Sequence, residues 1–185
     1  MMPTGRRESG ASTHSDRYSL ELMRDDVIAL VQTLGWFPVA LVGHSLGGVV
    51  AYLAAAERPD LFDRRVLEET PAPMPCDPPR VLGRRPEGID YDWAAAEAVC
   101  AQRNHPDPRW WDRLTQVRVP VLVVSGGPAS HLRPNEQRDL ADRFPDARMV
   151  ILDAGHLVHA VRPVEFAKVV ADFLDSPVRP SRRTG

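Results

Sequence analysis

A single short segment restricts the possible folds of this chain more than any other. The apolar residues 39–42 (Val-Ala-Leu-Val) lead directly into residues 43–47 (Gly-His-Ser-Leu-Gly), and an alanine-rich helix is expected over residues 46–57. An uninterrupted apolar run is typical of a strand that is buried on both faces of a parallel sheet. The segment therefore predicts a strand, a tight turn and a helix in succession, with Ser45 at the turn.

The turn itself suggests chemistry. A serine at such an elbow adopts a strained backbone conformation, so its near neighbours must be small, and Gly43 and Gly47 meet that requirement. The elbow lifts the serine hydroxyl above the sheet and directs the Leu46 N–H towards a developing oxyanion. We therefore expect Ser45 to be a nucleophile and Leu46 to be an oxyanion donor. The alternative is a glycine-rich turn whose serine only caps the helix.

A serine nucleophile needs a base, and the best-placed histidine is His156. It follows Gly155 on a loop between the last expected strand and the last expected helix. A base that comes after the nucleophile matches the chain order of elbow enzymes. His159 is the alternative base, and the other histidines have no comparable placement: His14, His44, His105 and His131.

Helices and strands alternate along the rest of the chain, which predicts an α/β fold with a parallel sheet. Further helices are expected over residues 19–34, 91–103, 107–114, 134–144 and 163–174. Further strands are expected over residues 66–70, 119–124 and 149–152. The first helix should bury an apolar stripe made of Leu20, Met23, Val27, Leu30, Val31 and Leu34.

The Pro- and Trp-rich residues 71–114 interrupt this alternation and are expected to form a short helical lid. The core is expected over residues 18–70 and 115–175, with a flexible N-terminal segment at 1–17 and a mobile tail at 176–185. Trp93, Trp110 and Trp111 in the lid could contact a compact apolar or aromatic group of a substrate, or could simply seal the core.

The sequence resembles the α/β-hydrolase family from about residue 7 to residue 174. Beyond the elbow, the resemblance rests on residues 18–21 (Tyr-Ser-Leu-Glu) with Asp26, residues 120–127 (Pro-Val-Leu-Val-Val-Ser-Gly-Gly), residues 154–156 (Ala-Gly-His) and residues 162–166 (Arg-Pro-Val-Glu-Phe). Family members usually carry the triad acid after the strand expected at residues 119–124, where this chain has Ser130. Some members carry it after the preceding strand. The resemblance therefore implies Glu69 as the triad acid, or Glu68 as the alternative.

The chain also departs from the family at its N-terminal end, where members have several additional strands. Residues 7–12 (Arg-Glu-Ser-Gly-Ala-Ser) look like a degraded form of the family's Arg-Gly-His-Gly-x-Ser loop, and the sequence before that loop is missing. The missing part normally supplies the second oxyanion N–H. Its loss would leave residues 39–42 as an exposed apolar edge strand, which predicts a homodimer formed through that edge.

Composition narrows the function classes. Hydrophobic residues make up 43% and charged residues 26%, and the formal net charge is −2, so nucleic-acid and anionic-membrane partners are not expected. The N-terminus lacks an apolar signal-peptide core, which makes the cytoplasm the expected compartment. Cys76 and Cys100 are too few for a disulfide framework, and no ligand cluster surrounds either one, so we expect no metal and no cofactor.

These observations favour a serine hydrolase that cleaves a small carboxylic ester, or a lactone, thioester or amide. Ser45 would form an acyl-enzyme and His156 would act as its base. A truncated or catalytically impaired relative, acting as a binding module or an inactive fragment, is the first alternative. An acyltransferase on the same scaffold is the second.

Overall fold

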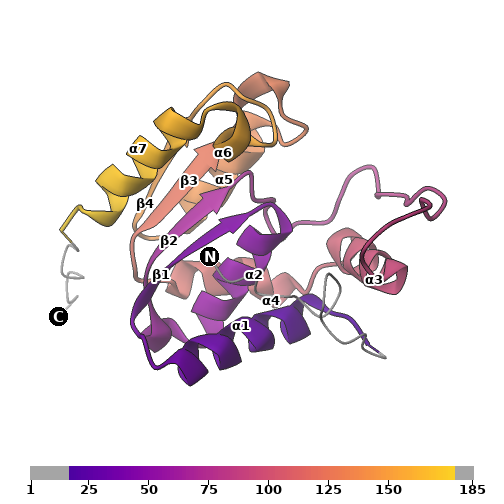
Figure 1. Ribbon diagram of the computed structural model, residues 1–185, viewed down its shortest axis with the longest axis horizontal. Coiled ribbons are helices and arrows are strands. Elements are labelled where there is room, and N and C mark those ends of the chain that lie inside the picture. The colour runs from indigo at the N-terminus through magenta and orange to yellow at the C-terminus, as the bar shows by residue number, and fades with distance from the viewer. Residues whose placement is uncertain (1–16, 178–185) are drawn as a thin grey trace.

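A computed structural model describes residues 17–177 of the chain (Figure 1). Four parallel strands form one sheet in the order β1-β2-β3-β4: β1 (Val39–His44), β2 (Phe62–Glu68), β3 (Val121–Ser125) and β4 (Ala147–Ile151). Val42 is paired in register with Val66, and Val66 with Leu122. The parallel α/β sheet expected from the sequence is confirmed. Residues 1–16 and 178–185 lie outside the described part, and with them the loop-like residues 7–12 and most of the expected terminal segments.

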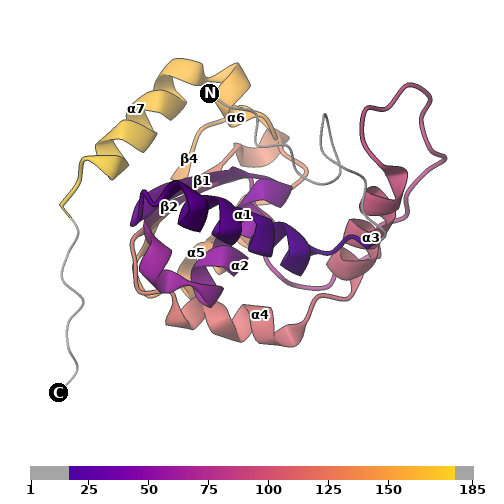
Figure 2. The same cartoon turned by 60° about the horizontal axis from the view of Figure 1, so that its bottom comes forward.

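Helices cover both faces of the sheet (Figures 1 and 2). The helices are α1 (Leu20–Leu34), α2 (Leu46–Glu57), α3 (Trp93–Asn104), α4 (Pro108–Arg113), α5 (Pro134–Arg143), α6 (Val158–Val161) and α7 (Pro163–Leu174). Short 3-10 turns occupy Pro59–Leu61, Leu114–Gln116 and Gly127–Ala129. In both views α3 and the loop before it project from the layered body. Within residues 17–177, no helix has the length and apolar character needed to span a bilayer.

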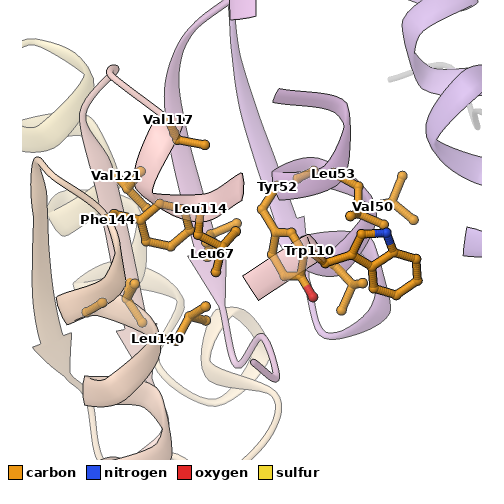
Figure 3. Close-up of a cluster of buried hydrophobic side chains, with 14 of the residues drawn as sticks. Val50, Tyr52, Leu53, Leu67, Trp110, Leu114, Val117, Val121, Leu140 and Phe144 are labelled. Atoms are coloured by element: carbon orange, nitrogen blue, oxygen red, sulfur yellow. The ribbon is translucent and has the colours of Figure 1, made fainter. Parts of the chain in front are cut away.

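The alternation of side chains along the strands builds two apolar layers. Leu67, Val121 and Val123 pack with α2, α4 and α5 on one face, around the buried side chains shown in Figure 3. Val66, Leu122 and Val124 pack on the other face against α6 and α7. Because β3 is buried on both faces along its whole length, it reads as the continuous apolar run seen in the sequence.

Two strands begin earlier than the sequence predicts, and the structure has one additional helix. β2 begins at Phe62 rather than Val66, because Arg64 pairs with β1 and Arg65 pairs with both β1 and β3, although charged residues are not typical of a buried strand. β4 begins at Ala147 rather than Met149, and the four-residue helix α6 was not expected.

The buried stripe of α1 also differs from the expected one. Ser19 caps this helix by accepting a hydrogen bond from the Leu22 N–H at 3.2 Å, and Gly35 ends it at a φ of 67°. Ile28 and Val31 pack against α2 and the Pro59–Leu61 turn. Leu30 and Leu34, expected in the stripe, remain 38% and 46% exposed because this contact lies on a neighbouring face of the helix.

Candidate active site

Ser45 lies at the turn between β1 and α2. Its backbone has a φ of 51° and a ψ of −118°, outside the regions that most residues adopt, and its N–H donates to the Glu68 carbonyl at 2.9 Å. A Cβ on Gly43 would come within 2.5 Å of the Gly47 carbonyl oxygen, and one on Gly48 within 1.8 Å of Thr70 Oγ1. The turn therefore depends on glycine at both positions.

Leu46 begins α2, which runs for 12 residues directly from this turn. The N–H groups of a first helical turn have no acceptor inside the helix, and the helix dipole adds a partial positive charge there. The backbone of Leu46 is therefore able to donate to an anion forming at Ser45.

Glu69 is the second strained residue of this region. Its φ is 47°. Within residues 17–177, Ser45 and Glu69 are the two non-glycine residues with a positive φ. Its side chain is completely buried. Strained backbone of this kind concentrates at functional sites, where the surrounding structure holds it in place.

The Glu69 carboxylate binds three groups. His156 Nδ1 lies 3.2 Å from Oε2, the Gly126 N–H donates to Oε1 at 2.5 Å, and the Ser130 hydroxyl donates to Oε2. Ser130 occupies the place where family members usually carry the triad acid, and here its hydroxyl donates a hydrogen bond to the Glu69 carboxylate. The contact with Glu69 leaves Nε2 as the ring nitrogen of His156 that can accept a proton.

The loop that carries His156 is fixed against the end of β3. The N–H groups of Ala154 and Gly155 both donate to the Gly126 carbonyl, at 3.0 and 2.9 Å. The backbones approach so closely that a Cβ on Gly126 would lie 1.8 Å from the Gly155 oxygen. This close packing positions His156 beside Glu69.

Glu68 faces a different histidine. Its carboxylate oxygens lie 2.9 Å from His159 Nδ1, and Oε1 also accepts the His159 N–H at 2.8 Å. The sequence left Glu69 and Glu68 as alternative triad acids, and His156 and His159 as alternative bases. In the structure Glu69 contacts His156, and Glu68 contacts His159. The left-handed backbone at Glu69 separates the two side chains that follow one another at the end of β2.

Two further histidines, which sequence reasoning set aside, also contact His156. His44 Nε2 lies 2.8 Å from the His156 carbonyl oxygen, with the ring centroids 4.7 Å apart. The His131 ring lies 4.3 Å from that of His156. His44 is the last residue of β1 and His131 follows β3, so both lie at the carboxyl ends of parallel strands, where sites of such sheets form, and that position is the signal that could have identified them.

The electrostatic surroundings of His131 are positive. Burial lowers the pKa of His131 most, its electrostatic interactions with His156 and Arg80 lower it further, Glu69 raises it, and Arg103 has the smallest lowering effect.

One group of side chains in the described region could hold a metal ion. His44, Glu68 and His159 each offer a ligand atom, and these atoms lie within 4.8 Å of one another. Two imidazoles and a carboxylate are a ligand set that zinc accepts. In the structure the Glu68 carboxylate is already within hydrogen-bond distance of the His159 ring and accepts its backbone N–H.

A cavity of about 770 Å³ lies beside His131. Its wall begins at Pro71, continues through the loop to Arg80, and includes Trp111 and His131. Of the lid tryptophans, Trp111 lines this cavity and Trp93 does not. Trp110 is 6% exposed and packs in the core with Tyr52 and Leu53 (Figure 3).

The comparisons with known proteins agree with this geometry. The sequence model of the alpha/beta hydrolase fold family matches residues 4–98, more than half of the chain. The chain belongs to the alpha/beta hydrolase fold family. The resemblance noted in the sequence is thereby confirmed.

Several relatives of this alpha/beta hydrolase are enzymes. It is 26% identical to the sn-1-specific diacylglycerol lipase ABHD11 of Mus musculus, over 91% of this chain and 69% of the lipase. Its fold matches the enol-lactonase of Burkholderia xenovorans with a TM-score of 0.76, at 25% identity over 91% of this chain and 78% of the lactonase. An esterase of Thermogutta terrifontis matches with a TM-score of 0.73, at 22% identity over 90% of this chain and 76% of the esterase. These relatives support a hydrolase function on ester bonds.

Proposed function

We propose that this chain is a serine hydrolase that cleaves a small carboxylic ester, or a lactone, thioester or amide, through an acyl-enzyme on Ser45. The observation that carries the proposal is the buried contact between Glu69 and His156 Nδ1 at 3.2 Å, in the same site as a strained serine turn. Isolated pairs of this kind are common, but the combination of the pair with an elbow matches the roles of a catalytic triad.

The first half of the reaction forms the acyl-enzyme. Ser45 Oγ attacks the acyl carbon while His156 Nε2 takes its proton, and the negatively charged Glu69 stabilises the imidazolium that results. The Leu46 N–H donates to the oxyanion of the tetrahedral intermediate. When the intermediate collapses, the bond to the leaving group breaks and His156 returns the proton to the departing alcohol.

The second half releases the acid. His156 Nε2 takes a proton from water, whose oxygen attacks the acyl carbon, and the bond to Ser45 Oγ then breaks as the serine regains its proton. The products are an alcohol and a carboxylic acid, and the enzyme returns to its starting state without a metal or a cofactor in any step.

The experiment that tests the proposal is covalent labelling. The protein is incubated with a fluorophosphonate, its intact mass is measured, and the Ser45→Ala and His156→Gln variants are treated in parallel. We expect stoichiometric labelling of the unsubstituted protein, none with Ser45→Ala, and labelling slower by at least about 100-fold with His156→Gln. A folded sample that takes up no label, or one that labels equally well without Ser45, would refute the proposal and leave the impaired relative as the better description.

Hydrolysis is then measured with p-nitrophenyl acetate, with and without a competing alcohol. Release of free acetate at the same rate as p-nitrophenol supports a hydrolase. Transfer of the acetyl group to the alcohol in preference to water would favour the acyltransferase.

A further inference from the structure

The cavity lined by His131 contains two arginines that form no ion pair with a carboxylate of residues 17–177. Four arginines line it: Arg80, Arg103, Arg133 and Arg143. Arg143 pairs with Asp112 at 2.8 Å, and Arg133 lies 3.9 Å from Glu136. Among residues 17–177, neither Arg80 nor Arg103 has a carboxylate within ion-pair distance.

Arg103 is the more unusual of the two. Its Nε and Nη1 atoms are buried and have no hydrogen-bond partner, and its Nη2 reaches only Cys76 Sγ, at 3.8 Å. A buried guanidinium N–H without an acceptor is unfavourable, and in native proteins such groups are usually paired. The C-terminal end of α3 offers Arg103 a favourable dipole, but a dipole does not provide an acceptor for these two atoms.

The loop and the helix that carry the two arginines are fastened together. The Arg80 N–H donates to Asn104 Oδ1 at 2.8 Å, and Asn104 Nδ2 donates to the Arg80 carbonyl at 2.9 Å. Cys76 Sγ donates to the Arg103 carbonyl at 3.4 Å. These bonds hold both arginines on one wall of the cavity.

This wall lies close to the proposed chemistry. His131 lines the cavity and its ring lies 4.3 Å from the ring of His156. The charge of Arg80, and to a smaller extent that of Arg103, lowers the pKa of His131. The cavity wall also begins at Pro71, two residues after Glu69.

The cavity also contains an unpaired acceptor. Gln137 is completely buried; its Nε2 donates to the Thr70 carbonyl at 2.6 Å, whereas its Oε1 is buried and has no partner. The carboxylates on the lining belong to the exposed residues Asp77, Glu136, Asp139 and Asp142, where water screens them. Among the described residues that line the cavity, the buried polar side-chain atoms without a partner are Nε and Nη1 of Arg103 and Oε1 of Gln137.

We propose that Arg103, assisted by Arg80, binds a carboxylate carried by the substrate, so that the preferred substrate is an ester or lactone bearing a second, anionic carboxyl group. A charge-assisted hydrogen bond from a guanidinium to a carboxylate is among the strongest available to a protein side chain, and a carboxylate would supply the acceptor that Arg103 lacks. The inference rests on the proposed function for the bond that is cleaved, and it adds the substrate class. It differs from the apolar or aromatic group that the lid tryptophans suggested.

The test compares two esters with four-carbon acyl groups, p-nitrophenyl hemisuccinate and p-nitrophenyl butyrate, which differ in a terminal carboxylate. We expect a higher kcat/KM for the hemisuccinate, and a loss of about 10- to 100-fold for this ester alone in Arg103→Gln. Arg80→Gln should lose less, and Arg103→Lys, which keeps the charge, should retain part of the preference. Arg109→Gln is the matched control, because Arg109 is an exposed arginine of the same segment outside the cavity lining.

A binding measurement makes the result independent of turnover. Monomethyl succinate is titrated calorimetrically into Ser45→Ala and into the double variant Ser45→Ala/Arg103→Gln, with methyl butyrate as the neutral ligand. We expect binding of the monoester to the first protein, loss of at least about 10-fold in affinity in the second, and weak binding of methyl butyrate to both.

The outcomes separate the two proposals. If butyrate ester is hydrolysed in a Ser45-dependent reaction but Arg103→Gln changes neither the ester preference nor the affinity, this inference is wrong and the proposed function stands. If neither ester is hydrolysed, the proposed function fails and the calorimetric comparison decides on the carboxylate site by itself. Should Arg103→Gln fail to fold by circular dichroism, an unchanged preference in both Arg80→Gln and Arg103→Lys would equally overturn the inference.

Discussion

Replacing one glutamate at a time at the end of β2 provides a sharp test of the site, because Glu68 and Glu69 are adjacent and equally buried. Their exposed fractions are 2% and 0%, and each contacts one histidine. Glutamine preserves the shape of the side chain and removes its charge. A pair of variants, Glu69→Gln and Glu68→Gln, therefore compares two similar perturbations that differ in which histidine loses its anion.

The expected size of the effect follows from the distance. With the charges of Glu69 and a protonated His156 at 3.2 Å, Coulomb's law at an effective dielectric constant of 20 gives about 5 kcal/mol in favour of the imidazolium. Since about 1.4 kcal/mol corresponds to a factor of ten, Glu69→Gln should lower kcat by about 10³- to 10⁴-fold. A glutamine amide could also hold the wrong tautomer of His156, which acts in the same direction.

The Glu68→Gln variant should behave differently. Its partner His159 is 46% exposed, and neither takes part in the proposed proton transfer, so we expect kcat within about 10-fold of the unsubstituted protein. The assay is the initial rate with p-nitrophenyl acetate, together with the rate of fluorophosphonate labelling and the thermal midpoint of each variant. The reasoning is refuted if Glu69→Gln keeps more than about a tenth of the activity, or if a folded Glu68→Gln loses as much as Glu69→Gln.

Three further predictions concern stability and ionisation. Gly48→Ala places a Cβ 1.8 Å from Thr70 Oγ1 and should lower the free energy of unfolding by about 1–3 kcal/mol in urea titrations, whereas Gly83→Ala, with open space around it, should not; equal effects would contradict the packing argument. Arg65 is 1% exposed, its three side-chain nitrogens have no hydrogen-bond partner, and burial lowers its pKa to about 9. Arg65→Met should therefore raise the free energy of unfolding by about 1–4 kcal/mol. A loss of stability in this variant would show that the charge of Arg65 is paired. An NMR titration should give His131 a pKa below 6.5, and Arg80→Gln should raise that pKa. Because the pKa of His131 is lower in the folded state than in the unfolded state, its contribution to stability is fully present above pH 6.5 and is lost as the pH falls through the folded-state pKa. A measured pKa above 6.5 would contradict the effect of burial and of the nearby arginines on His131.

The expected homodimer through β1 stays a prediction. β1 is one of the two edge strands of the described sheet, and Val42 on it is 50% exposed. Exposed apolar edges recruit partners. Sedimentation at several protein concentrations would detect a dimer, and a monomer at all of them would argue against this role of the edge.

Local chemistry made the elbow readable from the sequence. The glycines around Ser45, the apolar run before it and the small-residue helix after it all act within a few residues of one another, so their pattern determines the turn without reference to the rest of the chain. The alternation of helices and strands determined the parallel sheet for a similar reason, because strands buried on both faces must be continuously apolar. Where charged residues fall inside a strand, as at the start of β2, this signal fails.

Only the tertiary structure decided which groups meet at the site. Glu69 and His156 are 87 positions apart, and their contact depends on the register of β2 with β3 and on the close packing of Gly126 against Gly155. The positions of His44 and His131 beside His156, and of Arg103 in the cavity wall, depend on the same arrangement of strand ends. These contacts join segments that are distant in the chain, and a local sequence pattern does not determine how far apart such segments lie in the fold.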